Sequence, residues 1–521
     1  MNIIDKLHEQ AHQRPDQPAI IDVRHGMSRT TTFAELVELV EKTATLLHDM
    51  GLKPGDAVLV FQPMSLELYT ALLAIFHLQL TAMFLDPSAG RKHIEQCCAI
   101  GSPKALIASK KAHLLRLISP ALRHIPHKLA VGFGAWKSIP SLAAHSQPCT
   151  AVADTPALLT FTSGSTGEPK AALRTHGFLI AQHNALEEAL DLTSGAVDLA
   201  TLPIFILANL ASGMTSVIPD ADLRAPGKID PAPVVAQALH YNPSTVGASP
   251  AFMERICGYC SQTNTQLTSL KKVFTGGAPV FPSLLDKLQQ IAPQAEIVAV
   301  YGSTEAEPIA HIALSEIDEA DRTSMQSGGG LLTGRSVNSI QLRILKRQWG
   351  KPIGPFTNDQ FTNQFCETNE AGEIVVNGDH VLQGYLHGRG DSETKFHVQD
   401  ETDQIWHRTG DTGYLDKIGR LWLLGRCSAI IEDDRGLLYP FAIETAVQDT
   451  PGLARSAAVS HGGKRLLVVE PDDGAKLDLV LLAKRTEWAH LDEIHVVKKI
   501  PVDRRHNAKI DYPSLLKMLG T

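Results

Sequence analysis

Helix-like and strand-like patterns alternate along the first four hundred residues, and no other feature constrains the fold as strongly. Apolar residues at helical spacing over 33–49 are followed, after Pro54-Gly55, by an apolar strand pattern over 57–61. The same order recurs downstream, with a helix that ends near residue 77, a strand at 82–85, a helix around residue 94 and a strand at 105–107. Such alternation predicts crossover connections and mainly parallel sheets with helices on both faces.

A chain of 521 residues is too long for one ordinary core, so we expect two or more domains. The composition changes near Gly425-Arg426. Beyond this point the patterns predict an acidic turn at 432–434, a loop at 436–440, a helix from about 441, strands at 456–459 and 466–469, a helix at 477–484 and a strand at 494–497. The predicted fold class is α/β, with a large N-terminal domain of several subdomains (1–425) and a small α+β C-terminal domain (426–521).

The net charge of −8 argues against an electrostatic footprint for nucleic acid or for an anionic membrane, because such footprints normally show as a basic excess or cluster. Small anionic substrates are compatible with this charge, since local sites bind them. Seven cysteines, sparse and odd in number, predict no disulfide framework and favour a reducing, cytoplasmic setting. The C-x-x-C at Cys257 and Cys260 lacks a second pair or nearby His ligands, so we interpret it as two core or helix-surface thiols.

No segment predicts a signal peptide or a membrane span. The N-terminus carries charges from Asp5 onward and lacks the apolar segment of a signal peptide. The most membrane-like stretch, 66–85, contains Glu67, Gln79 and His77. A buried helix followed by a buried strand explains that stretch better than a membrane span does.

The sharpest local motif is TFTSGSTGEPK at 160–170, where an apolar strand pattern leads into a loop of small residues. The loop residues are Thr162, Ser163, Gly164, Ser165, Thr166 and Gly167, and Lys170 follows, with a helix expected from about Thr175. Small residues let backbone N–H groups and hydroxyls close around phosphate oxygens, and a lysine adds a movable positive charge. The loop is not a Walker A motif, because no Gly-Lys-Ser/Thr follows at the required spacing. We therefore expect a phosphate-binding loop in a strand-to-helix setting.

This loop resembles the phosphate loop of the adenylate-forming (AMP-binding) superfamily, which includes acyl-CoA synthetases, peptide-synthetase adenylation domains and beetle-type luciferases. Four more of the superfamily's motifs follow in its order: FTGGAPV at 274–280, VYGSTEAEP at 300–308, HRTGDTGYLDKIGRLWLLGR at 407–426 and IPVDRRHNAKIDYPSLL at 500–516. The resemblance spans nearly the whole chain. It implies a ligase that activates a carboxylic acid with ATP, forming acyl-AMP and releasing pyrophosphate, in an N-terminal adenylation domain closed by a mobile C-terminal lid.

The resemblance also assigns nucleotide-binding roles. It implies that Gly276, Gly277 and Ala278 lie against the adenine, where the small side chains permit close approach, and that Tyr301 packs nearby. Asp411 then accepts hydrogen bonds from the ribose hydroxyls, and Arg426 lies near the ribose and the hinge between the domains.

Three residues have implied catalytic roles. By resemblance, Thr304 contacts the α-phosphate and Glu305 helps to hold Mg²⁺, with Thr166 as a further metal ligand. Lys509, near the C-terminus, approaches the acyl carboxylate and the α-phosphate, where it stabilises the charge that develops during adenylation.

Three departures from thioester-forming relatives concern the second step. Ser428 stands where many of them carry Asp, an acidic run replaces a basic residue before Gly436, and Ala508 replaces the usual Gly before the lysine. These changes leave adenylation intact but weaken the expectation of a thiol step and of CoA binding. The apolar segment LPIFILANLASG at 202–213 hints at a fatty acyl chain, although plain core explains it equally well.

Three outcomes for the acyl-adenylate therefore stay open. The first is transfer of a fatty acyl group to a thiol, by a CoA or acyl-carrier-protein ligase that works with its pathway enzymes. The second follows from LPIFILANLASGMTSVIPD, YGSTEAEP and RHNAKI, which are similar to the β-lactone synthetases of bacterial olefin synthesis; these adenylate a β-hydroxy acid and close the ring without CoA. The third, a luciferase-like monooxygenase, shares the same motifs but is remote.

Overall fold

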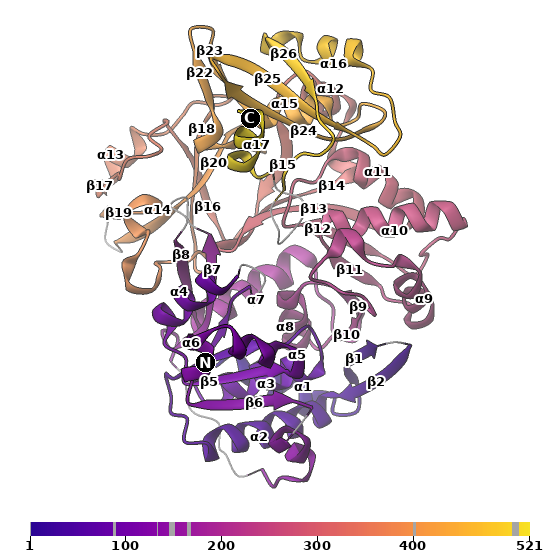
Figure 1. Ribbon diagram of the computed structural model, residues 1–521, viewed down its shortest axis with the longest axis vertical. Coiled ribbons are helices and arrows are strands. Elements are labelled where there is room, and N and C mark those ends of the chain that lie inside the picture. Colours follow the sequence, from indigo (N-terminus) through magenta and orange to yellow (C-terminus); the bar gives the residue numbers. More distant parts are fainter. Residues whose placement is uncertain are drawn as a thin grey trace. The chain divides into compact units, whose positions relative to one another are not determined.

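The computed structural model describes residues 2–24, 26–86, 90–132, 134–144, 152–163, 168–399, 403–502 and 510–520. The chain forms two compact units, whose elements are labelled in Figure 1. The first unit consists of Met1–Leu223, Asp230–Gly247 and Asp379–Asp391, and the second of Arg224–Ile229, Ala248–Gly378 and Ser392–Thr521. Both units mix helices with sheets, which confirms the predicted α/β class. The expected domain boundary at 425/426 stays a prediction.

The first unit contains a six-stranded sheet in the order β6-β5-β3-β4-β7-β8. Its strands are β6 (His127–Val131), β5 (Ala105–Ser109), β3 (Ala57–Phe61), β4 (Thr81–Phe84), β7 (Pro156–Ser163) and β8 (Pro169–Thr175). All neighbours pair in parallel except β7 and β8, which are antiparallel. The mainly parallel sheet and its predicted strands are thus confirmed.

Helices connect these strands as the alternation predicted. They are α2 (Phe33–Asp49), α3 (Leu66–His77), α4 (Arg91–Gly101), α5 (Lys110–His113), the 3₁₀ helix η2 (Leu114–Leu117) and α6 (Pro120–His124). The side chains of α3 are buried nearly all round, because the helix packs in the apolar core. The stretch at 66–85 is therefore a buried helix and strand, as expected. Among the described residues, no helix is long and apolar enough to cross a membrane.

A second group of strands in the first unit has the order β11-β9-β10-β1-β2. These strands are β11 (Thr245–Ala248), β9 (Val197–Ala200), β10 (Thr215–Ile218), β1 (Pro18–Arg24) and β2 (Met27–Thr32), with helices α1 (Ile3–Gln13), α7 (His176–Leu190), α8 (Pro203–Ser212) and α9 (Pro231–Tyr241). The apolar segment at 202–213 forms α8, whose Ile206 and Leu210 belong to the core.

The second unit begins with a parallel pair and continues as an antiparallel sheet in the order β12-β13-β14-β15-β21-β20-β18-β16. The strands are β12 (Lys272–Gly276), β13 (Glu296–Ser303), β14 (Ala306–Ala313), β15 (Leu331–Ser336), β21 (Leu421–Arg426), β20 (Gln404–Leu415), β18 (Gly372–Asn377) and β16 (Gln341–Leu345), with β19 (Lys395–Gln399) also on β20 and β17 (Phe356–Thr357) beside it. The helices include α10 (Pro250–Thr263), α11 (Pro282–Ile291), α12 (Glu319–Gln326) and α13 (Asn358–Thr362).

The thiols of Cys257 and Cys260 are buried side chains of α10. Burial raises the pKa of Cys257 to about 12 and that of Cys260 to about 11. Their interpretation as structural thiols is consistent with this position.

The C-terminal segment has two small apolar cores of its own. Its elements are β22 (Ile431–Asp433), β23 (Gly436–Leu438), α15 (Pro440–Val447), β24 (Leu453–His461), β25 (Lys464–Pro471), α16 (Leu479–Arg485), β26 (Glu493–Val496) and α17 (Tyr512–Leu519). The predicted helices and strands are confirmed, but the loop expected at 436–440 is wrong. Residues 431–438 form a β-hairpin, whose turn is closed by the Arg435 N–H on the Asp433 carboxylate.

A buried ion pair joins two neighbouring strands of the second unit. The guanidinium of Arg408 on β20 donates to both carboxylate oxygens of Glu373 on β18, at 2.6 and 2.7 Å, and each side chain is 1% exposed. Arg408 also donates to the carbonyls of Lys351 (2.6 Å) and Glu393 (3.3 Å). The charges are therefore satisfied, which a buried pair requires.

We expect Arg408→Met to lower the thermal unfolding midpoint strongly. Removing one partner leaves Glu373 buried and unpaired, which typically costs about 3–5 kcal/mol. Lys287→Met is the control, because it breaks an ion pair with Glu254 whose side chains are 50% and 46% exposed, and such pairs contribute about 0–1 kcal/mol. Differential scanning fluorimetry would show equal midpoints for the two variants if the buried pair contributed nothing.

Candidate active site

The carboxylate of Asp411 is held from two sides. The Tyr301 hydroxyl donates to Oδ2 at 2.8 Å, and the Arg426 guanidinium lies 3.1 Å from Oδ1. Strand pairing creates this arrangement, because Asp411 on β20 lies opposite Arg426 on β21 in the ladder. The Asp411 N–H also donates to the Thr409 hydroxyl at 3.1 Å. The carboxylate keeps lone pairs that can accept further hydrogen bonds, such as those from a diol.

Electrostatics fix the protonation of this group of residues. Burial and the negative charge of Asp411 raise the pKa of Tyr301 well above its ordinary value, so the phenol stays protonated and donates. The carboxylate of Asp411 raises the pKa of Arg426, with a smaller contribution from Glu305. The side chain of Arg426 is nevertheless 50% exposed, so it is available to a ligand.

A cleft of about 950 Å³ opens beside these residues, entirely within the second unit. Five of the predicted site residues line it: Gly277, Ala278, Tyr301, Asp411 and Arg426. Gly276, at the end of β12, supports the wall, since a Cβ there would lie 2.6 Å from the carbonyl oxygen of Val300. Gly277 has a φ of +80°, which favours glycine. The structure therefore brings the expected adenine and ribose residues together.

The cleft is also lined by residues that the sequence analysis did not single out. The Glu444 carboxylate, on α15, accepts from the Tyr512 hydroxyl at 2.7 Å and from the Ala458 N–H at 3.2 Å. Burial raises the pKa of Glu444 to about 8, against the effect of both hydrogen bonds. A single acid within the apolar helical run of 440–447 was the signal that could have identified it.

Thr304 and Glu305 form the turn between β13 and β14, and both are half-buried. The ladder pairs Ser303 with Ala306, so the turn directly follows the strand that carries Tyr301. One carboxylate at this position suits a hard cation that takes its other ligands from phosphates and water.

Lys170 lies in the first unit, on β8, where the ladder places it opposite Thr162 of β7. Its side chain is mostly buried, with Nζ 5.7 Å from the ring centre of Tyr385, and it runs alongside Gly390. The expected strand-to-helix setting of the loop is wrong: the segment joins two antiparallel strands, and α7 begins only after β8. The helix cap at Thr175 is as expected.

Several predicted residues lie outside the described part of the chain. These are Gly164, Ser165, Thr166, Gly167 and Lys509, and the side chain of Ser163 is likewise not described. The residue after Lys509 in the sequence is described. Ile510 pairs with Val502 in an antiparallel bridge and lines the cleft.

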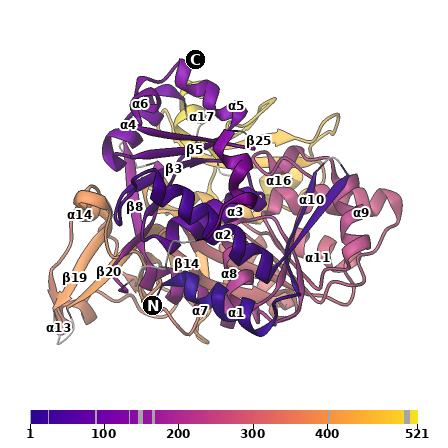
Figure 2. The same ribbon diagram turned by 90° about the horizontal axis from the view of Figure 1, so that it is seen from below.

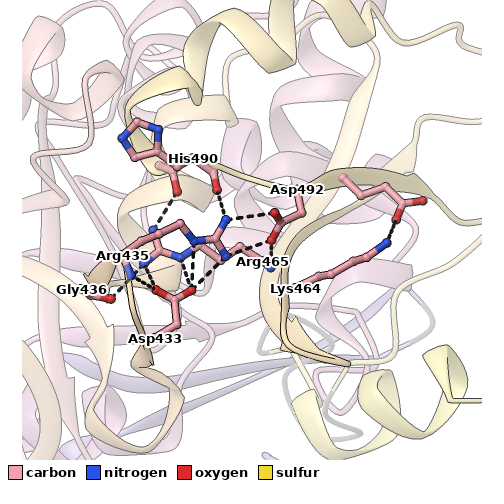
Figure 3. A network of polar contacts seen from close by, with 9 residues as sticks. Asp433, Arg435, Gly436, Lys464, Arg465, His490 and Asp492 are labelled. Carbon is pink, nitrogen blue, oxygen red and sulfur yellow. Dashed lines mark hydrogen bonds and ion pairs between the residues drawn. The ribbon is translucent and has the colours of Figure 1, made fainter.

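Ion pairs hold the acidic hairpin at 431–438, as Figure 3 shows. Arg465, which is 3% exposed, donates to both oxygens of Asp433 at 2.6 and 2.8 Å. Arg435 bridges Asp433 and Asp492. The Arg465 guanidinium holds the pKa of Asp433 well below its usual range. A separate pair links Glu432 to Arg347 at 2.9 Å, so two members of the acidic run have arginine partners.

Comparison with known proteins decides the family. A family model described as "AMP-binding enzyme" matches residues 7–386. The chain belongs to the AMP-binding enzyme family. It is thus an adenylate-forming enzyme of the ligase type that binds ATP, as the motifs predicted.

Full-length relatives include two olefin β-lactone synthetases, from Stenotrophomonas maltophilia and Xanthomonas campestris pv. campestris. Each is 30% identical to this AMP-binding enzyme, and each match covers 98% of the chain and 96% of the relative. A 4-coumarate–CoA ligase-like protein of Oryza sativa subsp. japonica is 25% identical, covering 92% and 77%.

Solved structures share the fold of this AMP-binding enzyme. ATP-bound MatB from Rhodopseudomonas palustris superimposes with a TM-score of 0.80 at 18% identity, over 99% of both chains. The anthranilate CoA ligase AuaEII, in complex with anthranoyl-AMP, gives a TM-score of 0.83 at 16% identity, over 100% of this chain and 98% of that one.

We expect Tyr301→Phe to raise the KM for ATP roughly tenfold with little change in kcat, because a hydrogen bond to a charged group is lost from the proposed ribose site. Tyr414→Phe is the matched control on the same strand as Asp411. Its hydroxyl donates to the Gly329 carbonyl at 2.9 Å, and Tyr414 is not among the residues that line the cleft. ATP–pyrophosphate exchange kinetics that respond equally to both substitutions would contradict this role.

Glu444 should make stability fall as pH rises. Its pKa is about 8 in the folded chain and 4.5 ordinarily, so between these values the folded state holds more protons than the unfolded state. The free energy of unfolding therefore decreases through this window. We expect the thermal midpoint of the wild type to fall relative to Glu444→Gln from about pH 5 to about pH 8. A constant difference between the two proteins would exclude this effect, and Glu254→Gln, at an exposed acid, is the control.

Proposed function

We propose that this enzyme adenylates a fatty β-hydroxy acid and then closes the acyl-adenylate to a β-lactone without CoA. The observation that carries the proposal is the similarity to two olefin β-lactone synthetases, at 30% identity over nearly the full length of both chains. The 4-coumarate–CoA ligase-like relative has a lower sequence identity, and its match extends over a smaller share of that relative.

The proposed reaction has two steps. A carboxylate oxygen first attacks the α-phosphorus of ATP, and pyrophosphate leaves, which gives the mixed anhydride. The substrate's own β-hydroxyl oxygen then attacks the carbonyl carbon; AMP leaves with the former carboxylate oxygen, and the hydroxyl proton is released. The products are a β-lactone, AMP and pyrophosphate. Because nucleophile and electrophile belong to one molecule, the second step requires only orientation.

The site residues have the following roles in this proposal. Tyr301 and Arg426 orient Asp411 for the ribose hydroxyls, and Gly276, Gly277 and Ala278 give the adenine a flat wall. Thr304 contacts the α-phosphate. Thr162, Ser163 and Lys170, with the loop at 164–167, bind the outer phosphates. Lys509 stabilises the charge that develops in adenylation.

Magnesium is the proposed metal. Glu305 would hold it from the β13–β14 turn, and Thr166 would add a hydroxyl ligand. When bound, Mg²⁺ neutralises charge on the triphosphate. A single half-buried carboxylate fits this ion, which is usually bound by one or two carboxylates together with substrate phosphates.

The hinge region supports a reaction without an external thiol. The acidic run, which stands where many thioester-forming relatives carry a basic residue, is engaged by arginines: Asp433 by Arg465 and Glu432 by Arg347. Acidic side chains at these positions cannot supply the positive charge that a basic residue would offer to the phosphates of CoA. We retain the division into an adenylation domain (1–425) and a lid (426–521) as part of the proposal.

The decisive experiment compares two acids of equal chain length, one with and one without a β-hydroxyl, each with and without CoA. We expect pyrophosphate release with the β-hydroxy acid in the absence of CoA, and a product lighter than the acid by one water in mass spectrometry. Lys509→Ala should reduce that release by about 10²- to 10³-fold, the usual effect of losing one charge-stabilising donor.

Other results would replace the proposal. An acyl-CoA product that forms only with CoA would identify a CoA ligase, and acylation of a carrier protein would identify the other thiol-dependent ligase. Oxygen consumption would identify a monooxygenase. No pyrophosphate release with any acid would contradict the adenylation step itself.

A further inference from the structure

Residues 96–153 contain no aspartate or glutamate, although the whole chain has 56 of them and a net charge of −8. Seven cations lie in this stretch: Lys104, Lys110, Lys111, Arg116, Arg123, Lys128 and Lys137. The chain is acidic as a whole, but this long segment is basic. Basic segments of this kind indicate a polyanionic partner.

The middle of this segment folds against one edge of the six-stranded sheet. Helices α5, η2 and α6 connect β5 to the edge strand β6, and Figure 2 shows α5 and α6 beside β5. Leu115, Leu122 and Ile125 face inward and pack in the core next to this sheet. The burial of these apolar side chains stabilises the segment against the six-stranded sheet.

Three large aliphatic side chains of the same short segment face solvent instead. Leu114 is 62% exposed, Leu117 is 75% exposed and Ile118 is 55% exposed. Single exposed apolar residues are ordinary on a protein surface. Three within five residues form a compact apolar tip, which costs solvation free energy unless it is covered.

Cations surround this tip. Lys110, Lys111 and Arg123 are exposed, and the Arg123 guanidinium donates to the carbonyls of Arg116 (3.4 Å) and Leu117 (3.3 Å), which places it against η2. Burial, followed by the positive charge of Arg116, lowers the pKa of Lys128. Arg116 and Lys128 are therefore close enough to each other to interact beside this segment.

We propose that the surface formed by Lys110, Lys111, Leu114, Leu117, Ile118 and Arg123 docks on an anionic lipid bilayer. The aliphatic side chains enter the boundary between headgroups and acyl chains, and the cations lie among the anionic headgroups. An anionic bilayer would contact both the aliphatic side chains and the cations of this surface. A nucleic acid would leave the aliphatic tip exposed, since single strands are bound through aromatic stacking and duplexes through polar contacts. The inference does not depend on which product the enzyme makes.

The test measures sedimentation of the full-length enzyme with vesicles. We expect binding to phosphatidylcholine vesicles that contain about one third phosphatidylglycerol, weak binding to phosphatidylcholine alone, and loss of binding at high salt, because headgroup attraction is screened.

Two variants separate the contributions. Lys110→Glu/Lys111→Glu should lower the vesicle partition coefficient about 30-fold or more, since each lysine near an anionic surface contributes about fivefold. Leu114→Ser/Leu117→Ser/Ile118→Ser should weaken binding as well, and the binding that remains should keep the salt dependence of the wild type. Lys498→Glu/Lys499→Glu, an exposed lysine pair elsewhere with the same charge change, should leave binding within about twofold.

ATP–pyrophosphate exchange with a water-soluble acid should be unchanged in the variants at 110–118, which shows that they are folded. Absence of vesicle binding by the wild type would overturn the proposal. So would equal binding by the wild type and by Lys110→Glu/Lys111→Glu, or binding to an acidic carrier protein or to nucleic acid without binding to anionic vesicles.

Discussion

The position of the Asp411 carboxylate depends on a hydrogen-bonded strand pair, and the proposed nucleotide site depends on that carboxylate. The ladder of β20 and β21 sets Asp411 opposite Arg426, and Tyr301 reaches the same group from β13. Donors on both sides fix the direction of the remaining lone pairs before any ligand arrives. Such preorganisation reduces the ordering that binding would otherwise require.

The same strand is fixed a few residues earlier by charge. Arg408 and Glu373 form a bidentate pair between β20 and β18, away from water, and two carbonyls accept the other guanidinium N–H groups. A slip of one residue along β20 would break this pair and turn Asp411 to the other face of the sheet. The buried pair thus specifies register, which an apolar pair of similar size would do less strictly.

Periodic patterns were sufficient to predict the elements near the two ends of the chain, but not the antiparallel sheet of the second unit. The helices and strands between residues 33 and 109 were predicted to within a few residues, because each apolar face packs in one core. The predicted setting of the phosphate loop was wrong, because β8 (PKAALRT) is buried along most of its length and shows no alternation of apolar and polar residues that would indicate a strand. Five of the predicted site residues line one cleft, and their nucleotide-binding roles stay predictions. Glu444 and Tyr512 were missed, because their contact joins residues 68 positions apart and no local pattern encodes it.

The net charge averages over the whole surface, so it does not describe the charge of any one face. An anion at one face responds to charges within about a Debye length, roughly 8–10 Å in physiological salt. None of the 56 acids of this chain lies between residues 95 and 154 of the sequence. Glu95 itself is on α4, which packs against α6, so the charges that the segment at 110–123 contributes are all positive while one acid lies on a neighbouring helix. The sequence argument against an anionic membrane uses the sum of charges, whereas the proposed docking surface depends on where the charges lie.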